Sequence, residues 1–258
     1  MMSVAAATLS FGPPLPAGLG ARERLQLQGF CVLGAQELAA LAGYDLSACQ
    51  PAFALWHDLP ADGYLKDGGH YRFRRHASFV QTLQTPSGEG GLHRVPHRAH
   101  WQPTAYNALH GGMLRWFAPL SDSLQQAGFW QPLLLGLGRL FAQVRAAPQW
   151  FIEAHQFRID PREGVGRPTP EGAHRDGVDF VAVILIARHA IRGGETRVFE
   201  LDGQRGVRFT LDEPCSALLM DDTRVIHETT PVLPDAPGTG SWRDTLVLTY
   251  RAGGFLQP

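Results

Sequence analysis

Lysine is almost absent from this chain of 258 residues: Lys66 is its only lysine, and arginine supplies the rest of the 23 basic side chains. The basic side chains are balanced by 24 acidic ones, so the formal net charge is −1. A chain with no excess of positive charge has no overall field that would hold nucleic acid or an anionic membrane surface. We therefore expect neither of these among its partners.

Long apolar runs are missing as well, and no segment approaches the roughly 18 consecutive apolar residues that a membrane span needs. The apolar stretch at residues 4–9 has no basic segment before it and is followed at once by prolines, which argues against a signal peptide. Cysteine is scarce: Cys31, Cys49 and Cys215 are odd in number and lack metal-binding spacing. Free thiols of this kind suit a reducing compartment, so we expect a soluble, cytoplasmic protein.

The chain has enough residues for one large domain, and its hydrophobic fraction of 44% is ordinary for a globular protein. We interpret residues 1–18 as a flexible lead-in and residues 19–258 as a single domain. Within that domain, residues 19–149 are predicted to be mainly helical. Residues 150–258 are predicted to be mainly β-stranded.

Two periodicities divide the domain in this way. Apolar residues recur at helical spacing in the first half and predict helices at 19–29, at 35–44, around residues 114–120 and from 133 to 144. Between them, residues 45–70 and 81–100 are predicted to be loops and residues 71–80 a strand. After Pro148 the period is two, which predicts strands at 150–160, 177–187, 195–201, 207–211, 216–221, 224–230 and 242–251. Helices followed by short consecutive strands indicate an α+β chain whose β half closes as a double-layered roll or barrel.

The first motif with chemical meaning is His174-Arg175-Asp176. Side chains two residues apart in an extended segment point to the same side, so His174 and Asp176 can bind one divalent metal together. His227 is the candidate for a third ligand, on a later segment of strand character. Two histidines and one carboxylate on one face of a metal form the ligand set of non-haem Fe(II) oxygenases.

A second motif, Arg243-Asp244-Thr245, follows in the last predicted strand. Arg243 and Thr245 share one face of that strand. A guanidinium fork next to a hydroxyl is suited to bidentate capture of a carboxylate. An alternative role for Arg243 is a structural salt bridge near Asp244.

Taken together, these motifs resemble the Fe(II)/2-oxoglutarate-dependent dioxygenase superfamily, and more narrowly its bacterial branch of free L-amino-acid hydroxylases of the isoleucine type. The matching segments are Pro170–Gly177, Gly193–Thr196, Asp221–His227 and Arg243–Thr249. The resemblance covers residues 150–251 well, residues 70–145 loosely and residues 1–69 hardly at all.

This resemblance implies a double-stranded β-helix (jelly-roll) core backed by helices from the N-terminal half. It also implies Fe(II) held by His174, Asp176 and His227, with 2-oxoglutarate as cosubstrate and O2 as co-reactant. Arg243 and Thr245 would bind the distal carboxylate of 2-oxoglutarate. On the first β-strand, His155 and Arg158 are further candidates for the cosubstrate pocket.

The implied substrate is a small molecule, and the branch favours a free L-amino acid. Its carboxylate would be held by an arginine from residues 72–75 or by Arg175. The candidate substrate-binding residues are Arg72, Arg75, Gln102, Asn107 and Arg175. An alternative is a cupin-like jelly-roll metal-binding protein, an isomerase or ligand sensor without oxygenase activity. Such a protein would not need the carboxylate anchor formed by Arg243 and Thr245.

Overall fold

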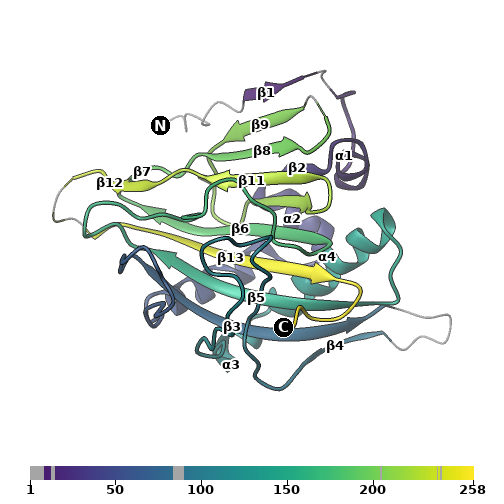
Figure 1. The fold of residues 1–258 in the computed structure, drawn as a ribbon. Coiled ribbons are helices and arrows are strands. Elements are labelled where there is room, and N and C mark those ends of the chain that lie inside the picture. Colours follow the sequence, from purple (N-terminus) through teal and green to yellow (C-terminus); the bar gives the residue numbers. More distant parts are fainter. Residues whose placement is uncertain (1–8, 13–14, 84–89, 204, 237, 239) are drawn as a thin grey trace.

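The computed structural model describes residues 9–12, 15–83, 90–203, 205–236, 238 and 240–258. Two antiparallel sheets face each other at its centre (Figure 1). The larger sheet has seven strands, in the spatial order β2 (Phe30–Leu33), β10 (Ala217–Asp221), β6 (Phe180–His189), β13 (Trp242–Arg251), β5 (Gln149–Ile159), β3 (Arg72–Thr82) and β4 (Gly91–Arg94). The fold is thus α+β, as the sequence pattern predicted, with the jelly-roll arrangement of strands that the resemblance implied.

The smaller sheet has four strands, in the order β1 (Leu9–Phe11), β9 (Gly206–Phe209), β8 (Thr196–Glu200) and β11 (Val225–Thr229). A separate two-stranded ribbon joins β7 (Ile191–Gly193) to β12 (Val232–Pro234). β11 carries His227 and belongs to the small sheet, whereas β13 carries Arg243 and belongs to the large one. The two predicted binding motifs therefore approach each other from opposite layers.

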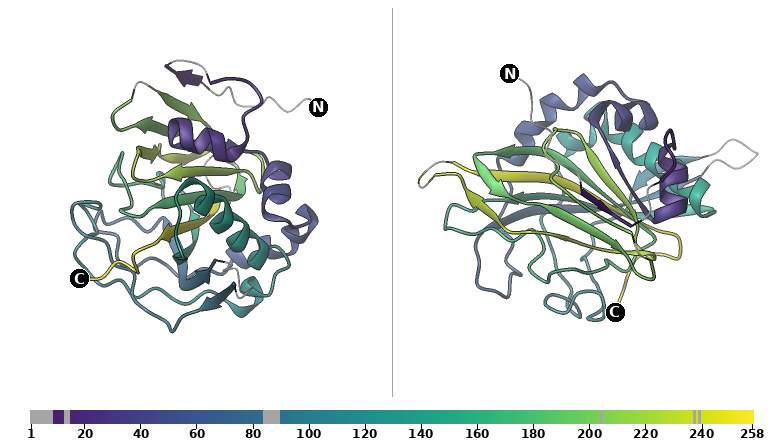
Figure 2. Two further views of the ribbon diagram at one scale, coloured as in Figure 1. Left: turned by 90° about the vertical axis from the view of Figure 1, so that its right-hand side faces the viewer. Right: turned by 90° about the horizontal axis from the view of Figure 1, so that it is seen from above.

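Helices α1 (Ala21–Gln28), α2 (Ala35–Ala42) and α4 (Trp130–Val144) cover the face of the large sheet that is turned away from the small one (Figure 2). The remaining helical segments are short: η1 (Leu46–Ala48), η2 (Gln50–Trp56) and α3 (Asp122–Gln125). α4 packs closely against α2 at Gly136, where glycine is needed because an added Cβ would come within 2.5 Å of the Cα atom of Ala42. No helix in the described residues is long and apolar enough to cross a membrane.

Alternation along β6 shows why one strand serves both layers. Phe180, Ala182 and Ile184 pack into the core beneath the helices, whereas Val181 and Leu185 pack into the core between the two sheets. Successive side chains of a strand point to opposite faces, so a strand covered on both sides must be apolar at every position. Burying each such large side chain stabilises the fold by about 1.5–3 kcal/mol.

Two aromatic side chains of the large sheet both pack against α4 and donate hydrogen bonds to its backbone. Trp150 Nε1 donates to the carbonyl oxygen of Gly138 at 2.8 Å, and the Tyr250 hydroxyl donates to that of Leu134 at 2.9 Å. Both side chains are fully buried, so these hydrogen bonds satisfy groups that would be costly to leave unpaired.

Most predicted elements are present, and several predictions from the sequence need correction. Residues 114–120 form no helix; they are extended, with bridges from Arg115 to His100 and from Pro119 to His76. Part of the lead-in, Leu9–Phe11, is strand β1. The predicted loops contain further elements, namely η1, η2 and strand β4. β2 was not predicted, because four residues between two helices show too short a pattern to recognise.

Candidate active site

His174, Asp176 and His227 lie together, with one ligand atom from each side chain within 4.8 Å of the others. The two histidines are held opposite each other by a pair of backbone hydrogen bonds, each of 3.0 Å, between a loop and β11. His174 Nδ1 donates to the carbonyl oxygen of Gly172 at 2.8 Å, which leaves the lone pair of Nε2 free. Nδ1 of His227 is buried without a hydrogen-bond partner. Free imidazole nitrogens beside a carboxylate fit a first-row metal.

The loop that carries Asp176 is fixed by Asp222, a residue at the turn before β11. The Asp222 carboxylate accepts hydrogen bonds from the backbone N–H groups of Asp176, Gly177 and Val178 at 2.8–3.1 Å. Burial and the nearby Asp176 charge raise the pKa of Asp222 to about 7, against the opposing effect of these hydrogen bonds. Gly177 adopts a φ of +81°, and a Cβ there would come within 2.4 Å of the Tyr106 ring.

A cavity opens beside these three residues between the two sheets. Its floor is the inner face of the large sheet, because alternate residues along part of β13, β5 and β3 line it. Paired residues form rows across the strands, and one row runs Thr245, Phe157, Arg74. Adjacent strands are about 4.8 Å apart, so the backbone of Arg74 lies about 10 Å from that of Thr245.

Arg243 is the basic side chain at the β13 end of the cavity. It is 3% exposed, and its Nε and Nη2 atoms have no hydrogen-bond partner. Burial, with a smaller effect from Arg188, lowers the pKa of Arg243 to about 10, so it stays cationic at neutral pH. A buried and unpaired guanidinium is costly, and an anionic ligand would remove that cost.

The structure does not bring three of the predicted site residues to this cavity. Arg158 alternates to the other face of β5, where its guanidinium pairs with Asp244 at 2.6 Å. Arg75 likewise lies on the face of β3 opposite to Arg74 and donates to backbone carbonyl oxygens. Arg175 is turned away from the cavity, donates to the carbonyl oxygen of Asp222 and lies over the Tyr106 ring.

Gln102 and Asn107 do line the cavity, although their polar atoms are already bonded to protein. Gln102 Oε1 accepts from Asn107 Nδ2 at 3.2 Å and from Arg115 Nη2 at 2.8 Å. Its Nε2 donates to the backbone oxygen and to Oδ1 of Asp176, both at 3.3 Å. Gln102 therefore connects a buried arginine to Asp176 and orients that carboxylate.

Arg72 and Arg74 extend the basic lining along β3. Arg72 Nε donates to Asp62 at 2.7 Å, and Arg74 Nη1 lies 3.7 Å from the same carboxylate. The Arg74 guanidinium is stacked between the rings of Phe117 and Phe157, 3.7 and 4.3 Å from their centroids. Arg74 Nε has no hydrogen-bond partner. One carboxylate thus serves two buried arginines, and positive charge remains in excess.

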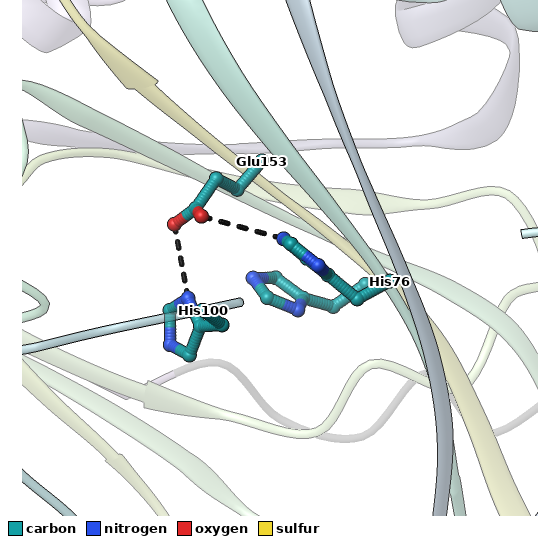
Figure 3. Close-up of side chains that lie close together, drawn as sticks. His76, His100 and Glu153 are labelled. Carbon is teal, nitrogen blue, oxygen red and sulfur yellow. Dashed lines mark hydrogen bonds and ion pairs between the residues drawn. The ribbon is translucent and has the colours of Figure 1, made fainter. Parts of the chain in front are cut away.

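A second group of candidate metal ligands lies further along the cavity. His76, His100, Glu153 and His155 each offer a ligand atom within 4.8 Å of the others, and all are buried. Figure 3 shows Glu153 between His76 and His100, with contacts of 3.3 and 3.0 Å. Burial opposes ionisation of Glu153, but its contacts with His100 and His76 outweigh it and hold its pKa well below the usual range.

Arginine side chains occupy part of this second group. Arg98 forms an ion pair with Glu153 at 2.8 Å. Arg74 Nη2 lies 2.7 Å from Nδ1 of His155, which must be the acceptor because a guanidinium can only donate. Two cations in direct contact disfavour a metal ion here more than at His174, Asp176 and His227. His155, predicted to lie in the cosubstrate pocket, lines the cavity as a neutral partner of Arg74.

Several side chains of the site were not predicted as site residues. Asp222 was interpreted only as a turn residue, whereas Arg74 falls within residues 72–75, the segment from which an arginine was expected to hold the substrate carboxylate. Glu153 looks like one acidic residue within a strand, and its partners come from distant segments. Glu171 had a usable signal, since it lies three residues before His174 in the matching segment Pro170–Gly177.

The chain is similar to proteins of known structure over most of its length. The sequence model of the 2OG-Fe dioxygenase family matches residues 54–249. The chain is 58% identical to a bsmA homolog from Methylobium petroleophilum, over 95% of this chain and 97% of that one, with a TM-score of 0.87.

Two more distant structures share the fold. IDO from Bacillus thuringiensis is 16% identical, over 94% of this chain and all of that one, with a TM-score of 0.72. The Fe(II)/(alpha)ketoglutarate-dependent dioxygenase TqaL is 19% identical, over 89% of this chain and 84% of that one, with a TM-score of 0.67. None of the curated proteins matches the chain.

Proposed function

Because the chain belongs to the 2OG-Fe dioxygenase family, we propose that this non-haem iron enzyme hydroxylates the side chain of a free L-amino acid. The family uses Fe(II) and 2-oxoglutarate, and O2 is the oxidant. Membership of this family contradicts the alternative expectation of a cupin-like protein without oxygenase activity. The observation that carries the proposal is a single cavity in which three candidate metal ligands, a buried Arg243 and further buried arginines meet.

In this proposal His174, Asp176 and His227 hold the iron. His174 is prepared by its hydrogen bond to Gly172, which directs the Nε2 lone pair away from the backbone. When bound, iron and 2-oxoglutarate supply the oxidation of an unreactive C–H bond, and the cosubstrate becomes succinate and CO2. The protein positions the reactants and excludes water, and its buried cavity is suited to both tasks.

Arg243 and Thr245 take the distal carboxylate of 2-oxoglutarate. Both side chains line the cavity from β13. The pairing of β13 with β6 has an irregularity between Asp244 and Thr245, where its register shifts. Asp244, the alternative partner of Arg243, is occupied by Arg158 on the other face. The Arg243 fork is therefore available to a ligand.

A small substrate is favoured because the arginines facing the cavity are deeply buried. Arg72, Arg74 and Arg115 are 6%, 4% and 2% exposed, so a folded macromolecule could not reach them. A free amino acid can enter whole and place its carboxylate against them. Arg74 and Arg115 each keep an unpaired Nε for that purpose.

A substrate screen tests the proposal. The purified enzyme is supplied with Fe(II), 2-oxoglutarate, O2 and each protein amino acid in turn, and succinate and product mass are measured. We expect a small set of amino acids to increase succinate formation and to yield a product that is heavier by one oxygen atom. If every amino acid leaves succinate formation at the substrate-free rate, the assignment to amino acids is wrong.

Gln102→Leu tests whether Gln102 supports the metal site. The substitution removes the amide that donates to Asp176 while keeping a side chain of similar size. Loss of such a supporting partner typically costs about 10–100-fold in metal affinity, and we expect a loss in this range. Titration of the metal-free protein with Co(II), followed by absorption, measures it. Gln126→Ala, on the surface after α3, is the matched control. An unchanged Co(II) affinity would assign Gln102 to another role.

A further inference from the structure

Glu171 is a cavity-lining carboxylate that no protein group fully satisfies. Its Oε1 lies 3.5 Å from Nε2 of His174, and its Oε2 is buried without a hydrogen-bond partner. Among the described residues, His174 is the only basic side chain within ion-pair distance of it, and this contact carries opposite charges only when the imidazole is protonated. A buried carboxylate oxygen without a partner is costly, so its retention in a binding cavity points to a ligand that donates to it.

Metal binding would remove even the contact with His174. In the proposed enzyme the lone pair of His174 Nε2 is given to iron, so that nitrogen carries no proton to share with Glu171. Glu171 is not itself in the compact group of ligand atoms formed by His174, Asp176 and His227. Once the metal is bound, Glu171 is therefore an anion beside the reaction site with no cation of its own.

Unpaired groups of the opposite charge line the same cavity. Nε of Arg74 and Nε of Arg115 are buried without partners. Burial, followed by the charge of Arg72, lowers the pKa of Arg115 to about 10, and the charges of Asp62 and Glu171 act in the opposite direction. The charge of Glu171 thus acts to raise the pKa of Arg115, although the two side chains do not form an ion pair.

A cavity in which one carboxylate oxygen and two guanidinium Nε–H groups lack hydrogen-bond partners is complementary to a zwitterion. We propose that Glu171 binds the free ammonium group of the substrate while Arg74 and Arg115 bind its carboxylate. This inference rests on the proposed amino-acid hydroxylase function and makes it more specific. The enzyme would select unmodified α-amino acids and reject both N-acylated amino acids and acids that lack the amino group.

The test is a binding measurement with Glu171→Gln, which keeps size and an acceptor oxygen but removes the charge. Calorimetry under anaerobic conditions, with Co(II) and 2-oxoglutarate present, follows binding of the amino acid that best stimulates the wild-type enzyme. Loss of a charge-assisted hydrogen bond should weaken this binding roughly 10- to 150-fold. The N-acetyl and des-amino analogues should bind wild type weakly, and the variant should no longer discriminate against them.

Two controls distinguish binding of the substrate ammonium group by Glu171 from a non-specific effect of charge removal and from support of the metal site. Glu163→Gln changes an exposed glutamate and should leave amino-acid binding at the wild-type value. The Co(II) affinity of Glu171→Gln should also stay at the wild-type value; a loss would make Glu171 a metal-supporting residue and overturn the inference. Equal binding of the free and N-acetylated amino acids by wild type would overturn it as well. If wild type binds no amino acid at all, the proposed function falls together with the inference.

Discussion

Asp176→Ala, His174→Ala and His227→Ala are each expected to abolish turnover. Each substitution removes one of the three side chains proposed to hold the iron, and a site with two ligands would bind the metal weakly and in poorly defined geometry. Succinate formation with 2-oxoglutarate and the best amino acid measures turnover. Co(II) titration of the metal-free variants measures binding separately.

The fold should survive these substitutions, because the backbone and not the side chains of the three residues holds the site together. His174 and His227 are joined through their main-chain atoms, and Asp222 binds the backbone N–H group of Asp176. Circular dichroism and the thermal unfolding midpoint of the metal-free proteins should therefore remain near wild type. His93→Ala, an exposed histidine on β4, is the matched control for turnover. Near-normal Co(II) binding by any two of the three variants would refute the assignment.

The strands could be predicted because their apolar pattern follows from local geometry. β6 is apolar at successive positions since one face meets the helices and the other meets the small sheet. The residues of the proposed metal site could be named for a similar reason. His174 and Asp176 are two positions apart, and His227 lies on a later segment of strand pattern.

The segment from Leu114 to Leu120 shows where local pattern fails. Its apolar residues have helical spacing, yet Leu114 and Trp116 are 52% and 56% exposed while Phe117 and Leu120 are buried, so the four do not form one buried face that would stabilise a helix. Arg115 and Pro119 instead bridge to strand partners that are distant in sequence. These tertiary contacts determine the extended conformation of the segment, and the spacing of its apolar residues contains no information about them.

The arginines of the site illustrate the same limit at the level of single side chains. Arg72, Arg74 and Arg75 are equally plausible from sequence, but alternation places Arg75 on the face away from the cavity once the register of β3 against β5 is known. Arg158 forms an ion pair with Asp244 on the neighbouring strand and therefore does not face the cavity. Such pairings depend on which strands are adjacent, and sequence periodicity does not contain that information.

Arg243→Lys is expected to raise the KM for 2-oxoglutarate roughly 10- to 150-fold, which corresponds to about 1.5–3 kcal/mol for a charge-assisted hydrogen bond. Lysine keeps the positive charge but offers one compact ammonium instead of a planar fork. The unpaired Nε and Nη2 atoms of Arg243 are the donors that such a fork would use. Direct binding of 2-oxoglutarate, measured anaerobically by calorimetry, should weaken by the same factor as the KM. Arg208→Lys, exposed on β9, is the matched control.

Arg243→Met separates a cosubstrate anchor from a structural arginine. A buried guanidinium without a partner destabilises the ligand-free protein, so an apolar side chain of similar length should raise its thermal unfolding midpoint. Wild type should gain stability as 2-oxoglutarate is added, by RT ln(1 + [L]/Kd) at free ligand concentration [L], and the variant should gain little. A structural arginine would behave in the opposite way: its loss would lower the ligand-free midpoint and leave the stabilisation by 2-oxoglutarate intact. In that event the distal carboxylate would have to be held elsewhere in the cavity, where Arg72, Arg74 and Arg115 are the remaining buried cations.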